Sequence, residues 1–307
     1  MQHHRHTPGH DGHDGHDGHD HDRGLAHDLA VLEQRRRALG LLAGLAGIGG
    51  LSMIGCGGGG SDSGASTVST GSSSSGSTSS SGSTGSTSTT AGCSVIPEET
   101  AGPYPGDGSN SNGSGLTNAL ALSGIVRSDI RSSIGTASGT AGGVLLTLTL
   151  TLVNTNDSCA DLSGYAIYLW HCDREGRYSL YSSSIINENY LRGVQSTGTD
   201  GTVTFTTIFP GCYDGRMPHM HFEVYPSASA ATSYANKIKT SQIAFPTDVC
   251  TTVYSSASGY SSSLTNFNRI SFSTDNVFSD GYTTQLATLS GDVTNGYTAA
   301  LTVGISV

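Results

Sequence analysis

Leucine and threonine alternate along the segment GGVLLTLTLTLVN, which spans residues 142–154. Successive side chains of a β-strand point to opposite faces, so the leucines at even positions from 146 to 152 would share one face and the threonines between them the other. A strand with one apolar face has to bury that face against a second layer. The alternation therefore predicts a half-buried strand in a layered β domain.

Five further segments have the composition of strands. They are SGYAIYLWHCD (163–173), GTVTFTTIFPG (201–211), PHMHFEVYP (218–226), FNRISFSTD (267–275) and YTAALTVGISV (297–307). Gly, Ser, Asn and Asp residues between them are typical of turns, and no segment in this part of the chain shows a convincing helical period. We therefore predict an all-β fold, an antiparallel β-sandwich whose long loops form the functional site.

A segment rich in Gly, Ser and Thr, residues 57–92, limits the part of the 307-residue chain that can fold. It has almost no side chain worth burying, so ordering it would cost backbone entropy without compensation. We predict a flexible linker there and a single domain at residues 93–307. That domain carries nine Lys or Arg and sixteen Asp or Glu residues, an acidic balance that argues against nucleic acid as a partner.

Residues 1–56 combine a histidine-rich extension with features of an export signal. Three arginines at positions 35–37 precede a glycine-rich apolar run that is short for a membrane span and ends at Cys56. The arrangement resembles a twin-arginine signal, and the sequence MIGC resembles a lipoprotein cleavage box. We expect an exported protein in the periplasm or at the cell surface, with either a lipid anchor at Cys56 or plain cleavage nearby.

Nine of the twelve histidines lie in the first 27 residues. Imidazole and carboxylate groups in such a tract can collect transition metals, whereas an inert low-complexity extension needs no function at all. Cleavage of the signal would remove the tract under either interpretation.

Cysteine usage agrees with export. The cysteines after Cys56 match no CxxC metal spacing; they are Cys93, Cys159, Cys172, Cys212 and Cys250. In an oxidising compartment we expect two disulfides and one free thiol. Our prediction is that Cys212 is free and that the other four form the two disulfides, with their pairing left open.

His219 and His221 are candidate metal ligands. On a strand they would point to one face, while Met220 and Phe222 would point to the other. Only one other histidine, His171, follows residue 27. Histidine pairs at this spacing also occur on strands that bind nothing, so the pair alone indicates at most half of a metal site.

The motifs around this pair resemble those of the intradiol ring-cleavage dioxygenases. In chain order they are GPYPGDG (102–108), LWHCDREGRYSLY (169–181), LRGVQ (191–195), TIFPGCYDGRMPHMHFEV (207–224) and SQIAF (241–245). The resemblance covers essentially all of residues 93–307. It implies a β-sandwich enzyme that uses non-haem Fe(III) and O₂ to cleave catechol-type aromatics to muconate-type products, and the export signal and linker resemble the secreted branch of the family.

The resemblance also implies site residues. The Fe(III) ligands would be Tyr178, Tyr213, His219 and His221. Tyr213 would also leave the metal and act as a base, and Arg216 would stabilise negative charge on the substrate ring. Substrate contacts would come from Gly102, Pro103, Tyr104 and Gln242. The loop between Tyr213 and His219 is much shorter than in the catabolic enzymes, so their substrates do not carry over.

The donor types support a ferric site independently of the resemblance. Phenolate oxygen and imidazole nitrogen suit Fe(III), whereas a structural zinc site more often recruits thiolates. Several bland interpretations stay open: Arg216 could form a salt bridge with Asp214 or another nearby acid, Tyr181 could compete with Tyr178, and Gln242 could serve packing. Trp170, the only tryptophan, is expected in the core.

Two function classes follow from the sequence. The first is a dioxygenase whose partners are a catechol-like small molecule and O₂. The second is a secreted binding module on the same fold that captures aromatics or metal without turnover. The four ligands together with Arg216 favour the enzyme, because a binder has no need of a tyrosine that leaves the metal. The sequence predicts no oligomeric state.

Overall fold

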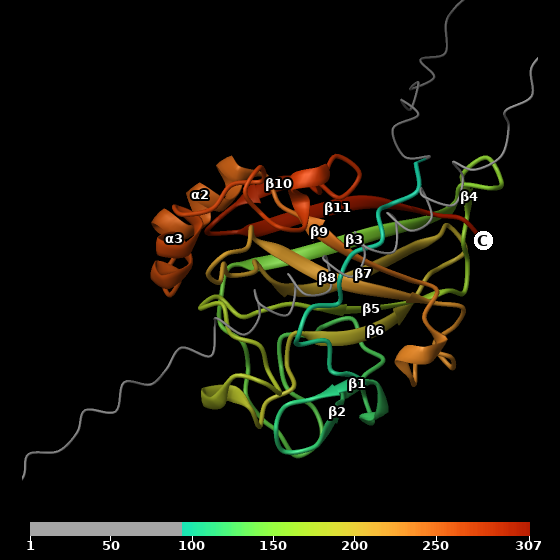
Figure 1. Cartoon of the computed structure of the whole chain (residues 1–307), viewed down its shortest axis with the longest axis horizontal. Helices are drawn as coiled ribbons and strands as arrows, with labels where there is room; N and C mark the ends of the chain where they lie inside the picture. Colours follow the sequence, from blue (N-terminus) through green and yellow to red (C-terminus); the bar gives the residue numbers. More distant parts are fainter. Residues whose placement is uncertain (1–93) are drawn as a thin grey trace, which may run out of the picture. The chain divides into compact units, whose positions relative to one another are not determined.

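Two β-sheets share one hydrophobic core in the computed structural model, which describes residues 94–307 (Figure 1). The predicted extension, export signal and linker, with Cys56 and Cys93, lie outside the described residues. The described chain is mostly β with two short α-helices, neither of which is long and apolar enough to cross a membrane.

The first sheet has five strands. They are β3 (Leu145–Asn154), β4 (Ala160–Asp161), β7 (Thr202–Ile208), β10 (Thr288–Asp292) and β11 (Gly296–Ile305). Strands β10 and β11 form an antiparallel pair, and β7 also pairs antiparallel with β3. Strand β11, however, runs parallel to β3, from Tyr297 beside Leu146 to Ile305 beside Asn154. The prediction of a wholly antiparallel arrangement is wrong here, because no hairpin turn dictates the direction of two strands so distant in sequence.

The second sheet is antiparallel and carries the predicted ligands. Its order is β6 (Arg192–Ser196), β5 (Ala166–Trp170), β8 (His219–Tyr225) and β9 (Lys239–Ala244). The register places Arg192, Trp170, His221 and Gln242 next to one another in one row across these strands. Because directly paired residues point to the same face, this row is built into one side of the sheet.

The core between the sheets confirms the predicted alternation. The leucines of β3 at positions 146, 148, 150 and 152 are fully buried, and they share one apolar cluster with Met220, Phe222 and Val224 of β8. His219 and His221 therefore point away from this core, as predicted from the period of two. A second cluster, which includes Trp170, Tyr178 and Tyr213, covers their face of the sheet.

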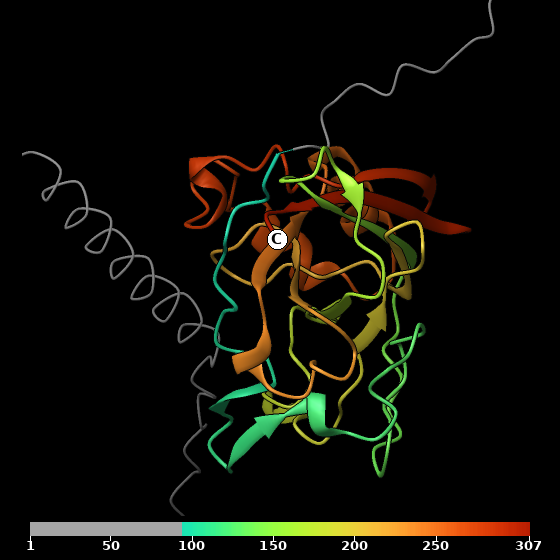
Figure 2. The ribbon, with the colours of Figure 1, turned by 90° about the vertical axis from the view of Figure 1, so that its right-hand side faces the viewer.

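The segment before β1 (Asp107–Ser111) runs from the first sheet to the edge of the second. Ile96 donates a backbone hydrogen bond to Gly304 of β11, and Glu99 donates one to Thr240 of β9. Figures 1 and 2 show the chain continuing from there to the small sheet of β1 and β2 (Leu116–Asn118), on the side of the domain away from β11. Short 3₁₀ turns occupy Ala119–Ala121, Ser183–Ile185, Tyr234–Asn236 and Phe278–Asp280.

Helices α2 (Thr247–Ser256) and α3 (Ser261–Phe267) correct the prediction that this part of the chain has no helix. The sequence of α2 is rich in β-branched residues and serine, which have weak helix propensity. Its stability comes instead from burying Cys250, Val253 and Tyr254, whose i, i+3, i+4 spacing forms one helical face. The strand expected at residues 267–275 is also wrong, because this segment is the end of α3 followed by turns.

The cysteines differ from the prediction in part. Cys159 is disulfide-bonded, whereas Cys172, Cys212 and Cys250 are free and buried. The free state of Cys212 is confirmed, and the inclusion of Cys172 and Cys250 in disulfides is wrong. The partner of Cys159 therefore lies outside the described residues. The free cysteines fill apolar space, as buried thiols commonly do.

We expect these thiols to be unreactive in the native protein. Burial raises the pKa of Cys172, Cys212 and Cys250, so little of the reactive thiolate is present at neutral pH. Iodoacetamide should not label these three thiols in the native protein. It should label all of them once the protein is unfolded, with no reductant needed, as peptide mass spectrometry can show. A peptide in which Cys172 is bridged to Cys250, or labelling of the native protein, would contradict this expectation.

Candidate metal centre

Three of the predicted ligands converge at the start of β8. The Nε2 atoms of His219 and His221 lie 3.0 Å apart, and the Tyr213 hydroxyl lies 3.1 Å from the Nε2 atom of His219. All three side chains are buried. Two imidazole nitrogens and a phenol oxygen at such distances form a donor set around one point.

Tyr178, the fourth predicted ligand, lies beside this group. Its ring is 5.8 Å from that of Tyr213 and 6.2 Å from that of His221, between centroids. Its buried hydroxyl has no hydrogen-bond partner of ordinary geometry among the described residues. Tyr181, the alternative, is engaged elsewhere: its hydroxyl donates to Asn110 and accepts from the backbone of Gly106. Tyr178, and not Tyr181, therefore lies at the site with a hydroxyl group that is available to coordinate a metal.

Two glycines allow the loops that carry the tyrosines to pack together. Gly176 has a φ of +86°, and a Cβ atom there would lie 3.2 Å from the Cα atom of Tyr213. A Cβ atom on Gly211 would lie 2.3 Å from the carbonyl oxygen of Asp173, which no real side chain could tolerate. The close approach of these loops fixes Tyr178 and Tyr213 on the same side of the histidines.

The protonation of the histidines suits metal binding. Burial, followed by the positive charge of Arg216, holds the pKa of His219 well below its usual value. Burial and the neighbouring His219 do the same for the pKa of His221. In His219 the Nδ1 atom lies 2.7 Å from the carbonyl oxygen of Met217, to which it donates, so its Nε2 atom keeps a lone pair. Neutral imidazoles of this kind are the form that binds metals.

Tyrosine ionisation in this site requires a cation. Burial and the neighbouring Tyr213 raise the pKa of Tyr178 well above its usual value. A phenolate at Tyr178 would therefore need a strongly charged metal next to it. No group of three or more His, Cys, Asp or Glu side chains in residues 94–307 could hold a metal, so the mixed set of two tyrosines and two histidines is distinct from the usual clusters of acids and thiols.

Trp170 and His171 are close to the predicted ligands in sequence, but only Trp170 lies against one of them. Trp170 is buried as expected, and its ring stacks on that of His221 at 4.9 Å and 5°, so it also supports a predicted ligand. His171 lies apart from the group. Its Nε2 atom is 2.7 Å from the Thr207 hydroxyl and its Nδ1 atom 2.8 Å from the Cys172 carbonyl oxygen, which uses both nitrogens.

Arg216 is held beside the group by a buried network. Its Nε atom lies 3.1 Å from a carboxylate oxygen of Asp275, and its Nη2 atom donates to the Gln242 side chain at 2.6 Å. Its Nη1 atom is 3.5 Å from the Tyr213 hydroxyl. The predicted salt-bridge alternative is thus realised with Asp275 instead of the exposed Asp214, and Arg216 still faces the tyrosine.

Gln242 and the loop at 102–104 take different places at the site. The amide of Gln242 bridges Arg216 and the carbonyl oxygen of Thr100, so it orients the arginine. Gly102 and Pro103 lie in the loop that approaches the site, and the ring of Tyr104 lies 5.0 Å from that of Tyr178. Arg192 ties this loop down by donating to the carbonyl oxygens of Tyr104 and Pro105.

Sequence reasoning missed Asp275 and Phe278. Asp275 is fully buried and also accepts hydrogen bonds from the backbone nitrogens of Met217, Val277 and Phe278. The Phe278 ring lies 6.4 Å from that of His219 and 5.8 Å from the Arg216 guanidinium. Both residues come from a segment that looked like a strand or turn, and no local signal links it to the histidine motif.

The known proteins that this chain resembles were found through structure. No protein-family model and no curated protein matches the chain. An intradiol ring-cleavage dioxygenase from Tetranychus urticae matches with a TM-score of 0.53 and 26% identity, over 70% of this chain and 95% of that chain. A second dioxygenase structure matches with the same values. The 3-chlorocatechol 1,2-dioxygenase from Rhodococcus opacus 1CP aligns at 16% identity and a TM-score of 0.42, over 68% of this chain and 71% of that chain.

The described domain therefore has the fold of a dioxygenase. The dioxygenases that it resembles in structure are the intradiol ring-cleavage enzymes, and the similarity extends over about 70% of the chain. The resemblance predicted from the ordered motifs is confirmed.

Proposed function

We propose that this domain is a non-haem iron(III) dioxygenase that cleaves catechol-type aromatics between their two hydroxyl-bearing carbons. The observation that carries the proposal is the convergence of Tyr213, His219 and His221 beside the buried, partnerless hydroxyl of Tyr178. Two phenols and two neutral imidazoles, with no thiol among them, are donors that fit Fe(III) better than structural zinc. In this setting iron(III) would supply a Lewis acid that binds catecholate and makes its ring reactive toward O₂.

The protein's own residues have separate tasks in this proposal. Tyr178, His219 and His221 hold the ion, and the Oη atom of Tyr213 accepts a proton from the incoming catechol. Arg216, fixed by Asp275 and Gln242, presents a permanent positive charge to the ring, where negative charge develops. The ring of Tyr104, 5.0 Å from that of Tyr178, and the backbone of Gly102 and Pro103 would contact a planar substrate bound at this centre.

We also propose that the enzyme acts outside the cytoplasm. The arginines at 35–37 and the Cys56 box motivate this location, and the disulfide at Cys159 supports an oxidising compartment. A lipid anchor at Cys56 would hold the domain at a membrane surface through the linker.

Colour and oxygen uptake test the proposed activity. The purified protein should contain iron and show a tyrosinate-to-iron charge-transfer band that shifts when a catechol is added. Oxygen consumption should accompany ring cleavage for at least one member of a panel of substituted catechols. A colourless wild-type protein that contains zinc would contradict the dioxygenase. A coloured protein that binds catechols and consumes no oxygen would identify the binding module instead.

A further inference from the structure

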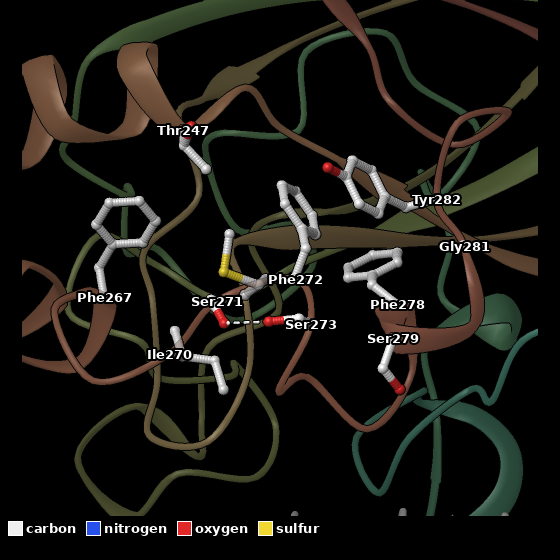
Figure 3. A pocket seen from close by; sticks show the side chains of 11 residues that line it. Thr247, Phe267, Ile270, Ser271, Phe272, Ser273, Phe278, Ser279, Gly281 and Tyr282 are labelled. Atoms are coloured by element: carbon white, nitrogen blue, oxygen red, sulfur yellow. Dashed lines mark hydrogen bonds between the residues drawn. The ribbon is translucent and has the colours of Figure 1, made fainter.

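A cavity of about 520 Å³ lies next to the candidate metal centre, in the C-terminal part of the domain (Figure 3). Its walls come from the end of α3, the turns that follow it and the 3₁₀ turn at Phe278–Asp280. The lining residues are Met217, Thr247, Phe267, Ile270, Ser271, Phe272, Ser273, Phe278, Ser279, Gly281 and Tyr282. None of the four candidate metal ligands is among them.

Aromatic rings form much of the wall. The rings of Phe272 and Tyr282 stack with centroids 3.7 Å apart and 12° between their planes, and Phe278 meets Phe272 edge-on at 5.7 Å. Figure 3 shows Phe267 on one side of the cavity and these three rings on the other, with Thr247 at one end and Ile270 at the other. The walls thus offer ring faces and edges, which favour stacked and edge-to-face contacts with another ring.

The chemistry of the lining excludes a charged ligand. No Asp, Glu, Lys, Arg or His residue lines the cavity. An ion bound there would lose hydration without gaining a partner. The hydroxyl groups of Ser271, Ser273 and Ser279 belong to exposed residues, so they offer hydrogen bonds at the rim, and Thr247 and Tyr282 add two further uncharged hydroxyl groups to the lining.

The cavity is separated from the metal centre by one layer of side chains. Phe278 and Met217 line the cavity and are themselves almost fully buried. Phe278 also contacts His219 and Arg216, as described above. A molecule in the cavity would therefore touch Phe278, whose ring also lies against Arg216 and His219, whereas Tyr178 and Tyr213 do not line the cavity.

We propose that this cavity is a second binding site, specific for an uncharged planar aromatic molecule of one or two rings. Its volume lies within the range of about 300–1,000 Å³ that is typical of small-molecule sites. The aromatic walls, the uncharged lining and the hydroxyl groups at the rim select that chemistry. The proposal goes beyond the dioxygenase activity, and it holds whether or not the adjacent centre binds iron.

Methionine NMR with indole tests the proposal directly. Indole is neutral and planar, and its N–H group can donate to a rim hydroxyl. In the full chain labelled with [¹³C-methyl]methionine and prepared without iron, the Met217 signal should shift saturably with added indole. Met220, only three residues away but buried between the sheets, is the internal control and should not shift. Absence of a saturable shift at Met217 would overturn the proposal.

A substitution at the rim of the cavity tests the proposed aromatic site independently of the candidate metal centre. Ser273 is exposed, so Ser273→Arg should leave the fold intact while placing bulk and charge at the mouth of the cavity. We expect indole affinity, measured by calorimetry, to fall at least about tenfold. Ser229→Arg, at another exposed serine outside the cavity, should leave the affinity unchanged. Equal indole affinity in both variants would overturn the proposal even if Met217 shifts.

Discussion

Replacing either His219 or His221 with alanine should remove both the iron and the colour that the proposed dioxygenase site would give the protein. Each substitution deletes one of two adjacent neutral imidazoles, and the phenols of Tyr178 and Tyr213 cannot complete the coordination sphere alone. Loss of residues that merely support a ligand commonly weakens metal binding about 10–100-fold, so loss of a ligand should weaken it at least about 100-fold. Metal analysis and the visible spectrum measure the effect.

His171→Ala is the matched control for this experiment. His171 is as deeply buried as the two predicted ligands and directly follows β5 of the same sheet, but its ring nitrogens face Thr207 and Cys172. The substitution should lower thermal stability while iron and colour persist. If His171→Ala lost iron as completely as His219→Ala, the loss would reflect general destabilisation, and the assignment of the ligands would be wrong.

Asp275→Asn should slow turnover by about 100-fold while leaving iron in place, a cost in the range seen when a preorganised electrostatic contact is lost. The carboxylate fixes the Nε atom of Arg216 and accepts from three backbone nitrogens. Removing its charge takes away the carboxylate that compensates the buried guanidinium, so we also expect a stability loss of about 3–5 kcal/mol. Steady-state oxygen uptake, metal analysis and chemical denaturation measure the three quantities.

A double-mutant cycle distinguishes positioning from a general structural role. If Asp275 acts through Arg216, the Asp275→Asn substitution should cost little further activity in the Arg216→Ala background, where no guanidinium is left to position. An equal loss of activity in both backgrounds would show that Asp275 does not act by positioning the arginine. Asp129→Asn, which removes an exposed ion pair with Arg131, should change neither activity nor stability appreciably and serves as the control.

The local pattern of the sequence predicts the central strands and the side of β8 on which the histidines lie. The alternation is clear in both strands: β3 buries its leucine face more deeply than its threonine face, and β8, buried on both faces, has Met220 and Phe222 on one face and the histidines on the other. Helix α2 could not be predicted in the same way, because its weak helix formers are stabilised by contacts of Cys250, Val253 and Tyr254 that exist only in the folded domain. The parallel β3–β11 pair likewise depends on residues far apart in sequence.

The candidate site also contains some residues that the sequence predicts and others that only the fold brings in. The motifs contain Tyr178, Tyr213, Arg216 and both histidines, and the structure brings all five together. The carboxylate that holds Arg216 in place could not be predicted, since Asp275 lies far along the chain in turns of unremarkable composition. The cysteine prediction failed for a related reason: export favours disulfides in general, but the position of each thiol in the packed domain decides whether it has a partner.

The candidate site depends on the register of four strands, because one row across them contains Arg192, Trp170, His221 and Gln242. It can form only when all four strands pair in this register. Insertion or deletion of a single residue within β8 would exchange the histidines with Met220 and Phe222, placing imidazoles between the sheets and apolar side chains at the centre. Chemistry and folding would then be lost in one step. Residues 102–104, 271–273 and 279–282 lie outside this row and are not the residues that hold Arg216, so the choice of ligand can diversify there while the proposed centre stays unchanged.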